Sequence, residues 1–436
     1  MSEYIIQRET LESIANAVRE KKGTTDLIPV TSLASEISSI ESGGGDIGTG
    51  DYTVKVIDYD GTVLLEKKGN TGGVIDLPTA PTHDKLVFQE WSASVSISDN
   101  KVTIADNDIM VGAVYTTASG QNEFDITLTN ATGLSVTLNM DGIKDWGDGT
   151  SDTETTHTYT AYGDYTIKCD GTTMTATHSA GSFGQSNSSK NYYCTAVRFA
   201  SITSISSYVF QYCLSLTSIV ISNSVTRMFM DAFYNCYSLT SAVIPNSVTK
   251  IDSNLFFNCY SLTSAVIPNS VASIGTDAFD GCYSLSNVVI PNSVTSIGQQ
   301  AFRQCYSLTN VVVPDSVTSM DDGSFVYCYS LTSAVMPSSV TSINSNLFLN
   351  CYSLSNVVIP NSVTSIGQQA FRQCYSLTKY DFSQYTSVPT LSNTNVFTNI
   401  NAICKIIVPD RLYNSWIAAS NWSTYADYIY KASEVA

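Results

Sequence analysis

Charged residues are scarce in this 436-residue chain, and positive charge is the scarcer sign. Only 14% of residues are charged, and 21 Lys and Arg stand against 38 Asp and Glu, for a formal net charge of −17. Each phosphate contact in a nucleic-acid complex needs a Lys or Arg, so this balance argues against a nucleic-acid partner. The net charge instead favours solubility.

Long apolar runs and histidines are also lacking. No apolar run reaches the roughly 18 residues that would span a bilayer, so we expect no membrane insertion. The opening residues are polar and charged, and the chain ends without an apolar tail, so we expect neither a secretory signal nor an anchor. Three histidines without metal-ligand spacing, and no recognisable catalytic constellation, predict no metal, no cofactor and no enzyme.

A period of 23 residues organises the second half of the chain. Such self-similarity is typical of a solenoid, in which each coil buries its apolar face against its neighbours. Cysteine recurs at this interval, and phenylalanine recurs three residues before each cysteine. The cysteine column comprises Cys213, Cys236, Cys259, Cys282, Cys305, Cys328, Cys351 and Cys374, and the phenylalanine column comprises Phe210, Phe233, Phe256, Phe279, Phe302, Phe325, Phe348 and Phe371.

One repeat shows how each coil is expected to fold. Leu239, Ala242 and Ile244 have the spacing L-x-x-L-x-L, which predicts a short parallel strand with these side chains inside. Phe256 and Cys259 then fill the rest of the coil. With coils about 4.8 Å apart, eight of them form a rod about 40 Å long. We expect this rod to have a core but no pocket.

Eleven cysteines raise the question of disulfides. Eight lie in the cysteine column, where their side chains point the same way, and parallel side-chain vectors disfavour a bridge. We therefore predict reduced thiols packed as small hydrophobic groups. Cys169, Cys194 and Cys404 lie outside the column, and their state stays open.

The repeat phrases I-P-N-S-V-T-S-I-G, A-F and C-Y-S-L resemble the BspA-like leucine-rich repeats of bacterial surface and phage proteins. The resemblance covers about 190 residues, and residues 286–308 and 355–377 are identical. It implies binding or display rather than catalysis. We assign the solenoid to residues 195–383 and a C-terminal cap containing Trp416 and Trp422 to residues 384–436.

The N-terminal segment, residues 1–45, predicts two short helices between residues 4 and 40. Neither helix is long enough to be stable alone, so a partner is required. The segment resembles one found on tail and baseplate-associated proteins of phages, which implies docking to other virion proteins or oligomerisation. A helical hairpin leader is the alternative. Residues 42–50 read as a flexible linker.

Residues 51–117 predict a small β-grasp-like module that resembles the internalin-type B-repeat. Its phrase D-Y-D-G-T, residues 58–62, also resembles the haloacid-dehalogenase phosphatase motif. That chemistry needs a doubly wound α/β domain, which about 65 β-patterned residues cannot build. We therefore interpret the Asp and Gly residues as a turn between two strands.

Residues 118–185 predict a second β module. The phrases W-G-D-G-T, H-T-Y and G-D-Y-T-I closely resemble the PKD-domain signature, which implies an immunoglobulin-like sandwich that serves as a spacer or a weak binding module. In that pattern His157 is a structural strand residue rather than a ligand. Residues 180–191 read as a second linker.

Two columns of side chains that run along the rod could bind a partner. Stacked tyrosines suit sugars or protein surfaces, although they could serve only to hold the edge of the solenoid together. The tyrosine column comprises Tyr237, Tyr260, Tyr283, Tyr306, Tyr329, Tyr352 and Tyr375. The valine column, expected to form a flat, uncharged outer face, comprises Val220, Val243, Val266, Val289, Val312, Val335 and Val358.

Together these features predict a multidomain, mainly β protein with short N-terminal helices, two small β modules, a leucine-rich-repeat solenoid and a cap. We expect a homo-oligomeric phage virion protein, a tail fibre or related appendage made in the host cytoplasm, that binds a host-surface glycan or protein. The alternative is a BspA-like adhesin on a bacterial cell surface. We expect ligand contact on the solenoid or its cap, with the two β modules as spacers.

Overall fold

The computed structural model describes residues 50–435, except 105–106, 129–133 and 175–191. The predicted helices and docking segment within residues 1–45 lie outside this part of the chain, as do the two linkers apart from Gly50. By its internal contacts the chain forms two compact units, which are described separately. The first comprises residues 1–54, 65–78 and 97–108, and the second comprises residues 55–64, 79–96 and 109–436.

The first unit contains a small antiparallel sheet in the order β3-β6-β5. Ile75 lies opposite Val102, and both side chains are buried because alternate strand residues point to one face. On the other face Lys101 pairs with Asp76 at 3.1 Å. The strands are β3 (Val74–Asp76), β5 (Ile97–Ser98) and β6 (Lys101–Thr103).

In the second unit, β4 (Leu86–Ala93) pairs antiparallel with the long strand β7 (Ile109–Thr117). Both belong to a sheet in the order β2-β1-β7-β4. Strands β1 (Tyr52–Ile57) and β2 (Val63–Gly69) of this sheet contribute residues to both units.

A tight turn joins β1 to β2, as predicted for the D-Y-D-G-T phrase. The N–H of Gly61 donates to the carbonyl of Asp58 at 3.1 Å, and Gly61 has a φ of +92°, which glycine adopts without strain. Asp60 accepts the N–H of Thr62 at 2.9 Å. The Asp58 carboxylate is buried and lies 2.9 Å from Nε2 of His83. These aspartates therefore stabilise a turn.

The second β module shares a sheet with the solenoid. Its larger sheet runs β11-β10-β13-β8-β14-β16, in which β14 pairs antiparallel with β8 and parallel with β16. Strand β8 therefore covers β14, the first strand of the solenoid. The strands are β8 (Asn122–Leu128), β10 (Lys144–Asp145), β11 (Ser151–Asp152), β13 (Gly163–Cys169), β14 (Tyr192–Arg198) and β16 (Ser218–Val220), with β9 (Leu134–Thr137) paired to β12 (Thr156–Tyr159).

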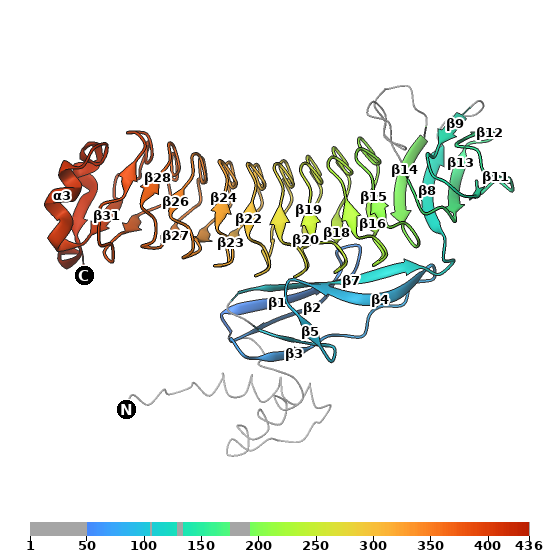
Figure 1. The fold of residues 1–436 in the computed structure, drawn as a ribbon, viewed down its shortest axis with the longest axis horizontal. Coiled ribbons are helices and arrows are strands. Elements are labelled where there is room, and N and C mark those ends of the chain that lie inside the picture. The colour runs from blue at the N-terminus through green and yellow to red at the C-terminus, as the bar shows by residue number, and fades with distance from the viewer. Residues whose placement is uncertain (1–49, 105–106, 129–133, 175–191, 436) are drawn as a thin grey trace, which may run out of the picture. The chain divides into compact units, whose positions relative to one another are not determined.

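The solenoid repeats two strands in most coils, and Figure 1 shows them side by side in a row that ends at α3. The three- or four-residue strands are the predicted ones: β18 (Ser241–Val243), β20 (Ser264–Val266), β23 (Asn310–Val312), β25 (Ser333–Val335), β27 (Asn356–Val358), β29 (Lys379–Asp381) and β31 (Lys405–Val408). The second, two-residue strands were not predicted: β15 (Ser204–Ile205), β17 (Arg227–Met228), β19 (Lys250–Ile251), β21 (Ser273–Ile274), β22 (Ser296–Ile297), β24 (Ser319–Met320), β26 (Ser342–Ile343), β28 (Ser365–Ile366) and β30 (Thr390–Leu391).

The interior of the solenoid confirms the predicted register. Leu239, Ala242, Ile244, Phe256 and Cys259 are all fully buried. Rings of the phenylalanine column stack from coil to coil with centroids 5.4 to 5.8 Å apart. One continuous core runs from the second β module through the coils into the C-terminal cap.

All eleven cysteines are free and buried. In the column, each thiol from Cys236 onward donates to the carbonyl of the phenylalanine 26 residues earlier, as Cys259 does to Phe233 at 3.4 Å. Burial raises the pKa of Cys259 well above its usual value. The column thus packs neutral thiols, in agreement with the prediction.

Left-handed turns close each coil without glycine at most positions. Asn254 and Asn258 both have φ of 55°, and Gln300 and Gln304 take the same places two coils later, with φ of 55° and 57°. Asparagine tolerates this region better than most residues, which explains its recurrence here.

The chain ends in a cap of short helices and one strand. Trp416 and Trp422 are fully buried, with ring centroids 5.3 Å apart, and Trp422 Nε1 donates to the carbonyl of Pro389 at 2.7 Å. The elements are η1 (Asp410–Leu412), α3 (Tyr413–Ala418), η2 (Trp422–Tyr428), β32 (Ile429–Lys431) and η3 (Ala432–Glu434). Among the described residues, no helix has the length and apolar character needed to cross a membrane.

Candidate functional site

The tyrosine column forms one continuous stack along an edge of the solenoid. Neighbouring rings lie 4.4 to 5.5 Å apart between centroids, with interplanar angles of 2 to 26°. Most of these rings are half-buried by their neighbours, whereas Tyr352 and Tyr375 are exposed. Burial raises the pKa of Tyr306, and the adjacent tyrosines raise it further, so this phenol is neutral at physiological pH. The column offers aromatic edges and hydroxyl groups, which suit a neutral partner.

The valine column is not the open face that we expected. Val243, Val266 and Val289 are buried against Ile57, Met110 and Val114, all within the second unit. The backbone of β7 approaches closely here, because a Cβ on Gly112 would lie only 2.7 Å from Val243 Cγ1. Val220 of the valine column is also buried. Val312 and Val335 are half-buried, and Val358 is 48% exposed. The free part of this face is therefore limited to the later coils.

Polar contacts flank the covered valines. Ser92 Oγ donates to the carbonyl of Ile244, and the amide of Asn246 donates to the carbonyl of Trp91 at 3.0 Å. The backbone N–H of Asn269 donates to the carbonyl of Ala93 at 2.8 Å. Strand β4 is thereby attached to two successive coils.

Two valines from the same column provide a test of this covering. We expect Val266→Ala to lower the free energy of unfolding by about 1 to 3 kcal/mol, because it removes two fully buried methyl groups. Val358→Ala, at the equivalent exposed position, should change it by less than about 0.5 kcal/mol. Chemical denaturation of both variants makes the comparison. Equal losses of unfolding free energy in the two variants would contradict the conclusion that the valine column is covered at Val266 and uncovered at Val358.

The other residues singled out from the sequence have structural surroundings. His157 stacks on Trp146 with centroids 5.0 Å apart, and its Nε2 lies 2.7 Å from the Asp148 carboxylate. No group of three or more potential metal ligands occurs in the part of the chain that the structure describes. Trp416 and Trp422, considered as a second contact area, are inaccessible because they form the core of the cap.

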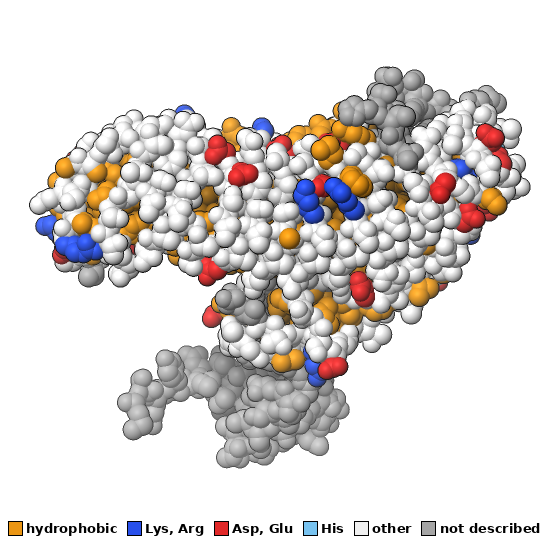
Figure 2. Space-filling view, in the orientation of Figure 1, with side chains coloured by type: hydrophobic (Ala, Val, Ile, Leu, Met, Phe, Trp, Pro, Cys, Tyr) orange, Lys and Arg blue, Asp and Glu red, His pale blue; other side chains and the backbone are white. Residues whose placement is uncertain are grey.

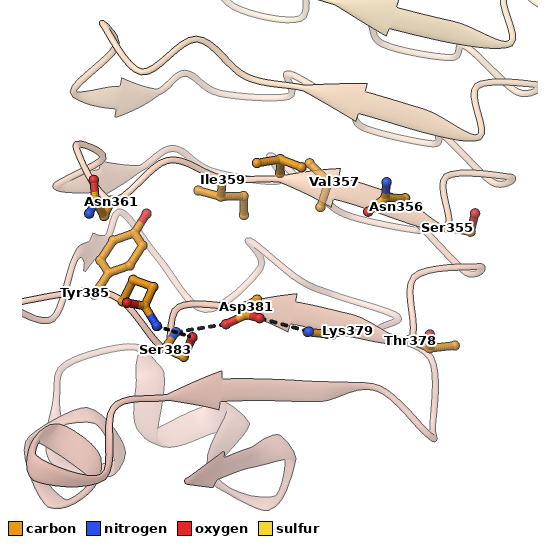
Figure 3. A pocket seen from close by; sticks show the side chains of 12 residues that line it. Ser355, Asn356, Val357, Ile359, Asn361, Thr378, Lys379, Asp381, Ser383 and Tyr385 are labelled. Atoms are coloured by element: carbon orange, nitrogen blue, oxygen red, sulfur yellow. Dashed lines mark hydrogen bonds and ion pairs between the residues drawn. The ribbon is translucent and has the colours of Figure 1, made fainter. Parts of the chain in front are cut away.

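A cavity of about 770 Å³ lies between two late coils, which corrects the expectation of a rod without a pocket. Figure 3 shows its lining side chains between β27 and the following coil. They are Ser355, Asn356, Val357, Val358, Ile359, Asn361, Thr378, Lys379, Asp381, Ser383, Gln384 and Tyr385. No sequence pattern marked this site, because it arises where the regular stacking of strands is interrupted.

Comparison with known proteins identifies the repeats. Residues 203–332 and 321–415 match the family model described as BspA type leucine-rich repeat region, in six copies. This family is a repeat region rather than a catalytic domain. No curated protein matches the chain significantly.

Solved leucine-rich repeat proteins are similar to parts of the chain. One from T. pallidum is 34% identical, over 35% of this chain and 72% of that one, with a TM-score of 0.34. One from Bacteroides ovatus is 26% identical, over 54% and 69%, with a TM-score of 0.40. A leucine-rich cell surface protein from Faecalibacterium prausnitzii is 26% identical, over 51% and 73%, with a TM-score of 0.31. Through its solenoid, this chain belongs to the proteins with BspA type leucine-rich repeats.

Proposed function

We propose that this chain is a non-catalytic binding protein that presents its solenoid to a bacterial surface. The observation that carries this proposal is the uninterrupted tyrosine column, which repeats one amphipathic side chain on seven successive coils. Figure 2 shows few charged side chains on the visible surface of the solenoid, so a neutral partner suits it better than a polyion. Weak contacts repeated along one extended ligand add up through effective concentration.

Two settings for this function follow from separate features. A phage tail fibre or related appendage is favoured by the resemblance of residues 1–45 to a tail-associated docking segment, through which the chain would join other virion proteins and form oligomers. An adhesin on a bacterial cell is favoured by the BspA type repeats. Immunogold labelling of purified phage particles and of bacterial cells distinguishes them, since the label should mark only one.

The tyrosine column is tested by a quadruple variant of Tyr260, Tyr283, Tyr306 and Tyr329 to serine. We expect binding of the purified full chain to bacterial cells or cell-wall glycans to fall at least tenfold, because four consecutive aromatic contacts are lost. Binding is measured by sedimentation of labelled protein with the cells. Circular dichroism should change little, since these rings are only half-buried.

A matched control replaces the same four tyrosines by phenylalanine, which keeps the stack and removes the hydroxyl groups. If this variant binds as well as the wild type, the aromatic faces carry the contact. A well-folded serine variant with undiminished binding would move the site away from the tyrosine column.

A further inference from the structure

The regular stacking of strands is interrupted between two late coils. Strand β27 is the last member of the sheet β23-β25-β27, and β29 is the first member of the separate sheet β29-β31-β32. Within each sheet the parallel strands are hydrogen-bonded in register, as Val335 with Val358 and Tyr380 with Ile406. No such ladder joins β27 to β29 in the described chain. The cavity of about 770 Å³ opens at this interruption.

The lining of the cavity combines an apolar wall with small polar groups. Val358, which is 48% exposed, supplies the accessible part of this wall, whereas its neighbours Val357 and Ile359 pack against the core. Tyr385 closes one end with its hydroxyl donating to the carbonyl of Pro360 at 2.7 Å. Apart from one charged pair, the remaining lining side chains carry hydroxyl or amide groups. They are Ser355, Asn356, Asn361, Thr378, Ser383 and Gln384. A cavity of this size is typical of sites for drug-sized molecules.

The two charged residues of the lining neutralise each other. Lys379 Nζ lies 2.9 Å from Asp381, and the Asp381 carboxylate also accepts the N–H of Ser383 at 3.0 Å, as the dashed lines in Figure 3 show. These contacts hold the pKa of Asp381 below its usual value despite partial burial, which acts in the opposite direction. The cavity therefore carries no net charge from its lining at neutral pH.

Asparagine at this place in a coil already forms intramolecular contacts elsewhere in the solenoid. Asn361 follows its coil strand at the position that Asn246 occupies in an earlier coil, and the Asn246 amide donates to a carbonyl of β4. An amide offers both a donor and an acceptor, as neighbouring sugar hydroxyls do. The apolar wall matches the C–H face of a pyranose ring.

From these features we propose that the cavity between β27 and β29 binds a neutral saccharide unit. Its amides and hydroxyls hydrogen-bond the sugar hydroxyls, and Val358 contacts the ring face. This inference names the ligand class of the proposed function and rests on it. An anionic sugar fits less well, because Lys379 is already paired with Asp381 and no other cation lines the site.

The test titrates the purified full chain with neutral di- to tetrasaccharides of glucose, mannose, galactose and N-acetylglucosamine, followed by calorimetry and saturation-transfer NMR. A digalacturonate and trialanine serve as the anionic and peptide comparisons. We expect at least one neutral sugar to bind, with less than a twofold change in affinity between 50 mM and 500 mM salt. Binding by digalacturonate or trialanine alone would overturn the proposal.

The chain contains its own matched control for the site. Asn361→Ala should weaken sugar binding at least tenfold, whereas Asn292→Ala should leave it unchanged, because Asn292 occupies the same place in an identical 23-residue repeat away from the cavity. Equal effects of the two substitutions would overturn the proposal. Absence of sugar binding by a chain that binds cells would reject this inference alone. Sugar binding by a chain that binds no bacterial surface would reject the proposed function.

Discussion

Replacing Phe279 by alanine is expected to lower the free energy of unfolding by about 3 to 5 kcal/mol. The Phe279 ring is fully buried and stacks between Phe256 and Phe302, with centroids 5.5 and 5.4 Å away. A coil contacts only its neighbours, so the cavity left by the ring can be relieved only by movement of two adjacent coils. Chemical denaturation followed by circular dichroism measures the loss.

The control for this prediction is Phe279→Leu, which keeps much of the buried volume and should cost clearly less than the alanine variant. If Phe279→Ala lowered the free energy of unfolding by less than about 1 kcal/mol, the stacked phenylalanine core would not be a principal source of stability.

Arg198 is the second position at which a single change should have a large effect. It lies on β14, where its guanidinium contacts Glu123 at 3.1 Å and Asp125 at 2.7 Å on the neighbouring strand β8. Arg198→Met leaves the buried carboxylate of Glu123 beside the half-buried carboxylate of Asp125, and we expect a loss of about 3 kcal/mol in the free energy of unfolding at pH 7. The matched control is Arg411→Met in the cap, where Arg411 donates to the backbone carbonyls of Tyr385 and Thr386, both uncharged.

The Arg198 effect should depend on pH. Burial acts to raise the pKa of Asp125, but hydrogen bonds and charge from Arg198 outweigh it and hold this pKa below its usual value. A lowered carboxyl pKa stabilises the fold above the unfolded-state value, near pH 4, and this contribution disappears as pH falls through the folded-state value. The difference between wild type and Arg198→Met should therefore shrink on acidification from pH 7 to pH 3. A constant difference would assign the loss to packing of the arginine stem.

The interior of the solenoid could be predicted because one repeating pattern determines it. Any coil contacts a near copy of itself on each side, so a residue such as Phe256 has the same surroundings in every repeat and its burial follows from the period alone. The turn at residues 58–62 could be predicted for a similar reason. Glycine and aspartate at fixed places favour a turn whatever the rest of the chain does.

Features formed by distant segments could not be predicted in this way. Ser92 and Ile244 are joined across 152 positions of sequence, and no periodicity links β4 and β7 to the coils that they contact. The valine face looked uniform in sequence because its covering strand belongs to another module. The cavity was also missed, since it depends on a change in strand pairing after Val358 rather than on a residue motif.

The placement of β7 has a consequence for how the gene can vary. Duplication or loss of one 23-residue unit preserves the stacking on both sides, so the rod can change length in whole coils without a new core. Such changes are restricted where β7 covers Val243, Val266 and Val289, because three consecutive coils must match one strand. Coils after Val289 have no such requirement. The number of coils should therefore vary among natural alleles in the part of the solenoid after Val289. The second of the two identical repeats, residues 355–377, lies in this part.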